Sequence, residues 1–245
     1  MIRLMAAAVL LAVTLIARAG SEEWLDLESR IQYGYYTEDA RSVQRLADTL
    51  AAQPGADPLR DYYLGLAGLR LAQLNLTRDA AHARDFLEQC AARLDEALRA
   101  QGESAEGLAL EASCLRMLGE LSAVRAPFAY ARSRSQMHRA LTLAPNNPRV
   151  LLLEGLAEEE QARSSSGTGG QALATLQRSV AAFEHERAGL ERPPSWGGAE
   201  AYAALARIYL TQRNAVAARE ALEHSLLLAP DFAYARRLMS RIVSG

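Results

Sequence analysis

The amino-acid sequence contains no lysine, and all 27 of its basic residues are arginines. This absence excludes three groups of enzyme mechanism that need a lysine side chain: P-loop nucleotide chemistry, Schiff-base chemistry and Ser-x-x-Lys acyl transfer. Strand signals are also scarce, because there are few runs of valine and isoleucine and no segment in which apolar and polar residues alternate. These absences direct the search for a fold toward helical proteins.

Metal and cofactor motifs are missing as well. The two cysteines do not form a Cys-x2-Cys pair, and no metal-ligand spacing links the four histidines, His82, His138, His185 and His224. The loop at 167–170 is rich in glycine, but a helix is expected before it, whereas a dinucleotide site follows a strand. No combination of nucleophile, base and orienting group can be traced. The sequence predicts a protein that is not an enzyme, with no catalytic residues, metal site or cofactor.

Residues 1–19 have the features of a secretory signal peptide. An arginine near the start precedes an apolar stretch, and Ala17-Arg18-Ala19 is a small-x-small cleavage site. The apolar stretch covers about 14 residues, short of the roughly 20 that cross a bilayer, so an uncleaved membrane anchor is the less favoured alternative. We therefore expect cleavage after Ala19, a periplasmic or secreted protein without stable membrane insertion, and one domain over residues 20–245.

The charge of the mature chain also limits its partners. Two of the 27 arginines, Arg3 and Arg18, lie in the signal peptide, which leaves 25 against 29 acidic residues and a net charge near −4. That balance argues against nucleic acid, which binds to basic surfaces. It also gives no reason to expect an anionic membrane as the partner.

Long stretches rich in alanine, leucine, glutamate and arginine favour helix throughout, and breaking residues divide them into antiparallel pairs. Asp57-Pro58 and Asn147-Pro148 each place an N-cap and a first-turn proline at the start of a helix. The predicted fold class is all-α, with about five helix pairs and a C-terminal capping helix. The pairs are expected at 22–36 with 37–53, 58–74 with 78–101, 103–124 with 127–143, 148–163 with 171–188, and 200–211 with 214–228, and the capping helix at 231–243.

Part of the sequence repeats itself. The stretch Ser225-Leu-Leu-Leu-Ala-Pro230-Asp echoes Ala140-Leu-Thr-Leu-Ala-Pro145-Asn. The later stretch closes a unit over 199–232 whose two helices read Tyr202-x2-Leu205-Ala206-x2-Tyr209 and Ala218-x3-Leu222-x2-Ser225-x4-Pro230. Self-similarity of this kind is typical of a solenoid, in which each helix pair buries its apolar face against its neighbours.

This unit resembles the tetratricopeptide repeat family, and the resemblance implies a right-handed superhelical solenoid that binds other proteins. Tyr63-x2-Leu66-Ala67 repeats the pattern of the first helix, with Arg70 in the place of a tyrosine. In Leu151-x2-Glu154-Gly155, Glu154 replaces the leucine. The chain also resembles a set of exported bacterial repeat proteins with an Asn-Asn-Pro-Arg junction, here at 146–149, and a Pro-x-Trp-Gly element around Trp196.

Cys90 and Cys114 lie 12 residues before and 12 residues after Gly102. If Gly102 turns two antiparallel helices, both thiols lie at the same height on apolar stripes. A disulfide there would stabilise the fold by roughly 3–4 kcal/mol in the chain-entropy model. Helix axes stand about 8–10 Å apart, however, whereas a disulfide needs Cα atoms within roughly 7 Å. A disulfide and two buried thiols both remain open, and a catalytic thiol is not favoured.

Candidate binding residues come from the aromatic side chains and from the resemblance. Aromatic residues are favoured at binding hot spots, which selects Tyr33, Tyr36 and Tyr62 as candidates to line a concave groove, with a place in the core as the competing interpretation. The resemblance implies that the first helix of each unit lines that groove, which adds Glu200 and Arg207. Arg207 could hold a carboxylate by two hydrogen bonds. The family's clamp for a peptide C-terminus uses lysine and asparagine at such positions, and neither is present here.

The function that follows is a non-catalytic scaffold for protein–protein interaction or assembly in the bacterial cell envelope, with a protein partner on a rigid concave surface. The alternative is a binder of a small envelope ligand, such as a glycan fragment or a cofactor, in the groove of the solenoid. The acidic run Glu158-Glu159-Glu160 either faces a cationic partner or is solvated. The sequence leaves self-association as a homo-oligomer open.

Overall fold

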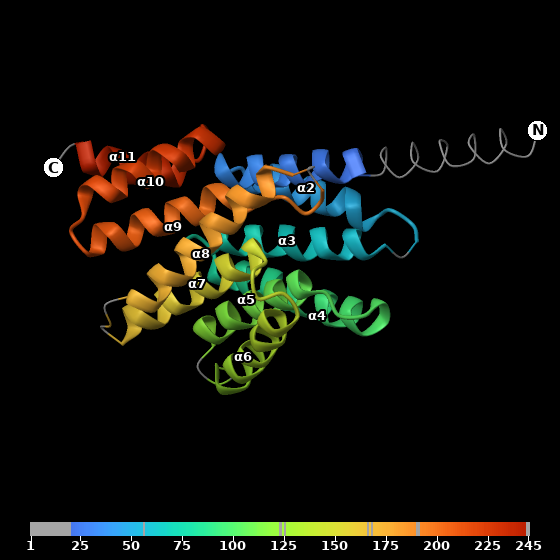
Figure 1. Cartoon of the computed structure of the whole chain (residues 1–245). Coiled ribbons are helices and arrows are strands. Elements are labelled where there is room, and N and C mark those ends of the chain that lie inside the picture. Colours follow the sequence, from blue (N-terminus) through green and yellow to red (C-terminus); the bar gives the residue numbers. More distant parts are fainter. Residues whose placement is uncertain are drawn as a thin grey trace, which may run out of the picture.

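The computed structural model describes residues 21–55, 57–122, 124, 126–165, 167, 169–189 and 192–243. The predicted signal peptide lies outside them. The described residues form helices, and none of them is in a strand, so the predicted all-α solenoid of five helix pairs with a C-terminal helix is confirmed (Figure 1). Across these ranges, no helix combines the length and the apolar composition that a bilayer crossing requires.

The helices follow one another as antiparallel pairs that stack side by side. The first pair consists of the N-terminal helix (residues 21–36) and α2 (Ala40–Ala51). The other pairs are α3 (Pro58–Asn75) with α4 (Ala80–Gln101), α5 (Ala105–Leu121) with α6 (Ala126–Leu143), α7 (Pro148–Ser164) with α8 (Gly170–Arg187), and α9 (Gly198–Thr211) with α10 (Ala215–Leu228), followed by α11 (Ala233–Val243).

Several helices begin at a side chain that caps them. The Asp57 carboxylate accepts a hydrogen bond from the backbone N–H of Leu59 at 2.8 Å, and Asn147 caps α7 in the same way. The predicted start of α2, at residue 37, was wrong by three residues, since the helix begins at Ala40. Asp39 caps that helix, because its Oδ1 accepts from the Ser42 N–H at 3.0 Å, while the Thr37 hydroxyl donates to the Tyr33 carbonyl oxygen.

A disulfide joins α4 to α5. The sulfur atoms of Cys90 and Cys114 are bonded, and their Cα atoms are 6.3 Å apart. Of the two alternatives that the sequence left open, the structure contains the disulfide. The two helices come close enough for this bond because the chain turns at Gly102 and α5 folds directly back along α4. The φ of Gly102 is +91°, in the region that favours glycine.

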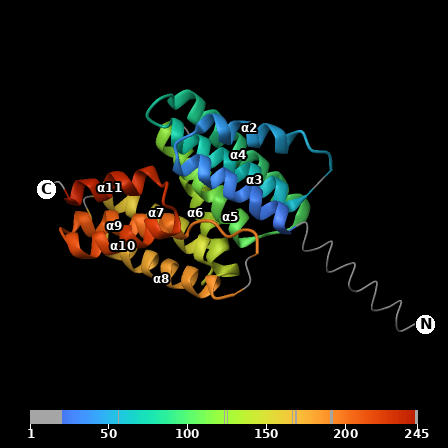
Figure 2. The same cartoon turned by 90° about the horizontal axis from the view of Figure 1, so that it is seen from above.

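The stack curls until its first helix meets its last pair. The backbone N–H of Ser195, in the connector between α8 and α9, donates to the Glu28 carboxylate at 3.0 Å. The ring of Phe232, before α11, lies 4.6 Å from that of Tyr36. Figures 1 and 2 show the N-terminal helix, in blue, beside this orange connector and the red C-terminal part. The solenoid therefore covers part of its concave side with its own first helix.

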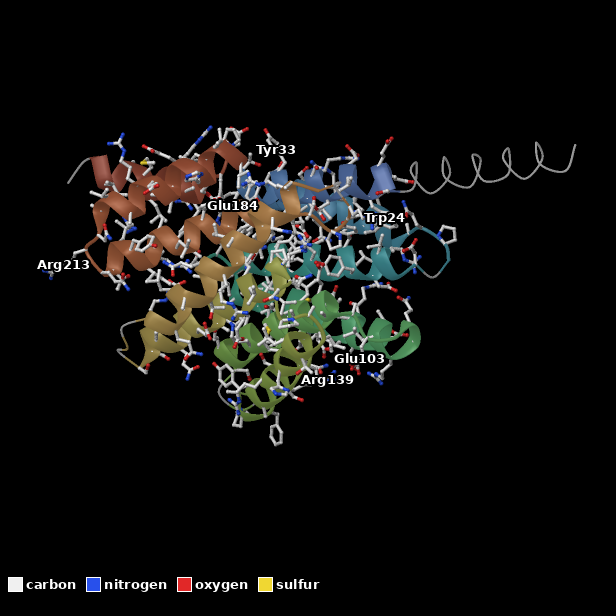
Figure 3. The ribbon with its side chains drawn as sticks, viewed as in Figure 1. Trp24, Tyr33, Glu103, Arg139, Glu184 and Arg213 are labelled. Carbon is white, nitrogen blue, oxygen red and sulfur yellow. A yellow bond between two sulfur atoms is a disulfide. The ribbon has the colours of Figure 1, made fainter. Side chains whose placement is uncertain are left out.

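One helix departs from the regular stack. In Figure 1, α6 diverges from α7, which packs mainly on α5 and α8. The position of α6 is fixed from the side of α5: the buried Glu111 carboxylate accepts hydrogen bonds from Gln136 Nε2 at 2.6 Å and Arg132 Nη2 at 2.7 Å. Arg139 of α6 also forms an ion pair with Glu103, and Figure 3 shows these two side chains together.

Candidate functional site

A buried polar cluster joins the N-terminal helix to α3 and α9; we call it the joint and define it by Gln32, Tyr36, Arg70 and Glu200. The Glu200 carboxylate accepts from Gln32 Nε2 at 2.7 Å and from the Tyr36 hydroxyl at 2.6 Å, and it forms an ion pair with Arg70. Arg70 Nε also donates to Gln32 Oε1 at 3.0 Å. Each charge in the joint thus has a partner of opposite sign and further hydrogen bonds, which is the condition for burying an ion pair without a large cost.

Aromatic rings hold the guanidinium of Arg70 from two sides. It lies 4.1 Å from the centre of the Tyr35 ring and 4.9 Å from that of Trp196. Cation–π contacts of this kind grow stronger when water is excluded, and Arg70 is 3% exposed. The side chain is therefore fully engaged inside the protein.

A second set of hydrogen bonds extends the joint toward the connector. The buried Glu28 carboxylate accepts from the Ser195 hydroxyl at 2.6 Å and the Tyr63 hydroxyl at 2.7 Å. Burial raises the pKa of Glu28, and these hydrogen bonds oppose that rise only in part. Nearby, the Trp196 indole N–H donates to the Tyr62 hydroxyl at 2.8 Å.

Tyr62 and Glu200, two of the candidates to line a groove, lie inside the protein. Each is 7% exposed, and each is bonded to other parts of the chain. The hydroxyl of Tyr36 is likewise held by Glu200, although one side of its ring borders a cavity. The N-terminal helix contacts Glu200 and the connector contacts Tyr62, which accounts for the burial of both residues.

The two remaining candidates are Arg207 and Tyr33. Arg207 forms an ion pair with both oxygens of Glu159 and also donates to the Tyr234 hydroxyl at 3.2 Å. Arg207 thus already binds a carboxylate by two hydrogen bonds, and that carboxylate belongs to the protein itself. Tyr33 is 59% exposed, and Figure 3 shows it on the outer edge of the N-terminal helix.

A cavity of about 440 Å³ lies beside the joint, between the N-terminal helix, the connector and the turn after α10. We call it the joint cavity. Its walls contain both aromatic and charged side chains. The aromatic rings are those of Tyr33, Tyr36, Phe183, Trp196 and Tyr202. The structure thus brings two of the predicted residues, Tyr33 and Tyr36, to one cavity and leaves the other three outside it.

A larger opening of about 620 Å³ lies where α6 diverges from α7. Its walls come from α5, α6 and α7. We call it the acidic groove, because four carboxylates line it together with two arginines: Glu120, Glu154, Glu158 and Glu160, with Arg116 and Arg134. The acidic run of the sequence was a partial signal for this groove, since Glu158 and Glu160 belong to that run.

The carboxylates of the acidic groove differ in their partners. Glu120 is paired with Arg116, and Glu160 with Arg163. Glu158 accepts one hydrogen bond, from Gln171 Nε2 at 2.5 Å, while its Oε2 is buried with no partner among the described residues. Glu154 is half-buried and forms neither a hydrogen bond nor an ion pair with any described residue.

Burial and repulsion both act on Glu154. Its removal from water raises the pKa of its carboxyl group, and the negative charge of Glu158 raises that pKa further. Burial also raises the pKa of Glu120, although Arg116 partly opposes the effect. The negative charges of Glu154 and Glu120 in the groove are therefore maintained at a cost in free energy.

An aromatic ring forms one wall of the groove. Tyr130 of α6 packs on α5 at Gly119, where an added Cβ would lie 2.8 Å from the Tyr130 Cε1 atom. The missing side chain of Gly119 thus makes room for the ring. In the described part of the molecule, no cluster of three or more histidine, cysteine, aspartate or glutamate side chains is arranged to hold a metal ion.

Comparison with known proteins supports the fold. No protein-family model matches the chain, and no curated protein matches it. Among solved structures, a thermophilic TPR protein of Thermus thermophilus is similar, with a TM-score of 0.57 and 15% identity over 92% of this chain and 100% of that one. The HusA haemophore of Porphyromonas gingivalis is also similar, with a TM-score of 0.55 and 19% identity over 76% of this chain and 92% of that one. These likenesses show a fold of the tetratricopeptide repeat type.

Proposed function

We propose that the protein is a non-catalytic scaffold of the bacterial cell envelope, which binds a segment of a partner protein in the acidic groove. The observation that carries this proposal is the groove itself. It is open between two helix pairs, its volume of about 620 Å³ suits a short segment, and one of its carboxylates, that of Glu154, has no partner among the described residues. The concave side near the joint, in contrast, is filled by the protein's own first helix.

Two features support the envelope as the location. The sequence of residues 1–19 has the pattern of a signal peptide. The bond between Cys90 and Cys114 suits an oxidising compartment such as the periplasm. Fractionation of the producing bacterium, with N-terminal sequencing, tests this part: we expect a periplasmic or secreted chain that begins at Gly20, and an uncleaved cytoplasmic chain would contradict it.

Two matched variants test the binding surface. Gln161 is an exposed residue of the acidic groove, and Ser29 is an exposed residue of the joint cavity. Gln161→Trp would block the groove and Ser29→Trp the cavity, each serving as the control for the other. In a pull-down from an envelope extract, we expect a stoichiometric protein partner with the wild type and Ser29→Trp, and its loss with Gln161→Trp. Equal recovery of the partner by all three chains would contradict binding in the groove.

The second candidate function is binding of a small envelope ligand in the joint cavity. The cavity, at about 440 Å³ and with several aromatic rings and a few charged groups in its walls, has the size and lining of a small-molecule site. One protein of similar fold is described as a haemophore, which is consistent with this alternative. Native mass spectrometry of the purified protein separates the two: a small molecule that is lost with Ser29→Trp and kept with Gln161→Trp would favour the second candidate.

A further inference from the structure

We propose that the joint cavity binds a small aromatic anion, whose flat rings pack against the aromatic walls and whose negative group is held by Arg187 and Arg192. This inference rests on the second candidate function and names the class of ligand that the cavity takes. It does not depend on the acidic groove. It commits to one occupant because the rings, the balance of charge and the hydrogen bonding of the walls all suit it.

The aromatic walls of the cavity are fixed by contacts with other side chains. The ring of Tyr202 stacks on that of His224, with 4.9 Å between their centres. The indole N–H of Trp196 donates to the Tyr62 hydroxyl at 2.8 Å. Walls that are already in place before a ligand arrives reduce the free-energy cost of binding. Aromatic rings attract other rings in stacked or edge-to-face geometry, which favours a ligand with a flat aromatic body.

The two basic side chains of the cavity have no acidic partner. Arg187 ends α8 and Arg192 lies in the connector, and neither forms an ion pair with a described residue. Both are exposed, so an entering group can reach them. The charge of Arg187 opposes the rise in the pKa of Tyr202, which shows that this guanidinium lies near an aromatic wall of the cavity.

The acidic side chains of the cavity, in contrast, already have partners. Glu186 binds the guanidinium of Arg149 through both of its oxygens, at 2.9 and 2.6 Å. Asp231 forms an ion pair with Arg236. The buried Glu28 accepts hydrogen bonds from two hydroxyl groups. The cavity therefore lacks a negative charge opposite its two arginines, and a guanidinium binds such a group by charge-assisted hydrogen bonds.

The hydrogen bonding of the walls argues against a sugar as the occupant. A sugar has many hydroxyl groups, and each one that is buried needs a partner. The polar side chains in the cavity wall are largely engaged with one another or with the joint. The Gln32 amide donates to Glu200 and accepts from Arg70. The Ser195 hydroxyl donates to Glu28. A molecule with an apolar body and one charged end needs fewer partners.

The test uses the mature chain and two fluorescent probes with the same aromatic body. Anilinonaphthalene sulfonate carries a negative charge, and phenylnaphthylamine is its uncharged analogue. Both fluoresce more strongly in an apolar site than in water, so a titration gives the dissociation constant of each. The chain has two tryptophans, of which Trp196 lines the cavity and Trp24 does not. In NMR spectra, we expect both probes to shift the indole N–H signal of Trp196 more than that of Trp24.

Two double variants distinguish the arginines of the cavity from positive charge in general. Arg187→Gln with Arg192→Gln removes the proposed partners, and Arg41→Gln with Arg45→Gln makes the same change in charge at exposed arginines of α2 that form no ion pair with a described residue. We expect the first to weaken binding of the sulfonate roughly fivefold to tenfold, as the loss of two exposed ion pairs implies, and to change binding of the uncharged probe less than about twofold. The second should change neither.

A second pair of variants tests the aromatic wall. Tyr33→Ala removes an exposed ring of the cavity, and Phe128→Ala removes an exposed ring of α6. Neither ring belongs to the core, so both variants should keep the circular dichroism of the wild type. We expect Tyr33→Ala to weaken both probes roughly threefold or more, because a ring–ring contact is lost, and Phe128→Ala to leave both unchanged.

Three results would each overturn the inference. They are an equal effect of Arg187→Gln with Arg192→Gln on the two probes, equal effects of the cavity variants and their controls, and a Trp196 signal that does not move.

The inference and the second candidate function can fail separately. If native mass spectrometry finds an uncharged small molecule that is lost with Ser29→Trp, the cavity carries a ligand and the inference falls. If the probes behave as expected but no small molecule accompanies the protein from the envelope, the site for an aromatic anion stands and the second candidate function falls.

Discussion

The joint and the acidic groove each contain a charged residue at a position where the repeat pattern has an aromatic or apolar one. In α3, Arg70 stands where the first helix of a repeat has tyrosine, and in α7, Glu154 stands where it has leucine. Glu158 occupies in α7 the position that Arg70 occupies in α3, since each lies seven residues after the large residue that begins the pattern. A charge therefore replaces an apolar or aromatic side chain in both helices.

The outcome differs because only the joint receives a second element of the chain. The N-terminal helix brings Gln32 and Tyr36, α9 brings Glu200, and Arg70 is fully paired. No element of the described chain brings a cation to Glu154. A charge inside this solenoid therefore either receives its partner from a distant part of the chain, as at the joint, or has no partner among the described residues, as at Glu154.

The largest effect is expected from breaking the joint. Arg70→Ala leaves Glu200 buried without its cation, and loss of one partner of a buried ion pair costs about 3–5 kcal/mol. Urea unfolding, followed by circular dichroism, measures the change in the free energy of unfolding. Arg219→Ala is the control, since it breaks an exposed pair with Glu223 and should cost less than about 1 kcal/mol. Similar losses in both variants would show that the joint does not hold the solenoid closed.

A comparable effect is expected from the disulfide, which fixes α5, a helix that lines the groove, to α4. The double variant Cys90→Ser with Cys114→Ser should lose roughly 3–4 kcal/mol, as the chain-entropy model gives for a loop of this length. A reducing agent should lower the melting temperature of the wild type and leave that of the double variant unchanged. If the reducing agent has no effect on the wild type, the disulfide does not contribute to stability.

The fold could be predicted from the sequence because its signals are local. Caps such as Asp57 and Asn147, the turn at Gly102 and the repeat around Ala206 each specify a few neighbouring residues, and their sum gives the helix pairs in order. The predicted helix ends differ from the observed ones by three residues at most. Local interactions thus carry most of the information that defines a solenoid.

The joint could not be predicted, because it depends on contacts between residues far apart in the chain. Gln32 and Glu200 are separated by 168 positions, and no short pattern specifies that they meet. Arg70 was a usable signal, since a charge at a core position of the repeat needs a buried partner. The acidic groove had a similar signal in Glu154, but its walls also come from α5 and α6, and no short pattern specifies how these helices lie relative to α7.

A smaller effect is expected from a change that touches the groove and leaves the joint intact. Gly119→Ala places a methyl group against the ring of Tyr130 and should cost roughly 1–3 kcal/mol by overpacking. The double variant with Tyr130→Ala should recover part of that loss, because the ring is no longer there to collide. A double-mutant cycle in urea measures the coupling. Additive losses would mean that the ring does not lie on Gly119.

The smallest effect on stability is expected from Glu154→Gln, which tests whether the charge of Glu154 lacks a partner. Burial and the repulsion of Glu158 raise the pKa of Glu154, so the folded protein holds this proton more tightly than the unfolded chain does. The associated stability is present below the ordinary pKa of 4.5 and is lost as the pH rises through the raised value. Glutamine resembles the protonated form, so the variant should match the wild type near pH 4.5 and exceed its stability at about pH 7.5 by a few tenths of a kcal/mol.

Thermal unfolding at the two pH values measures the difference, with Glu220→Gln, on the exposed face of α10, as the control for net charge. A variant less stable than the wild type at the higher pH would mean that Glu154 has a partner within the protein, and the contrast with the joint would disappear.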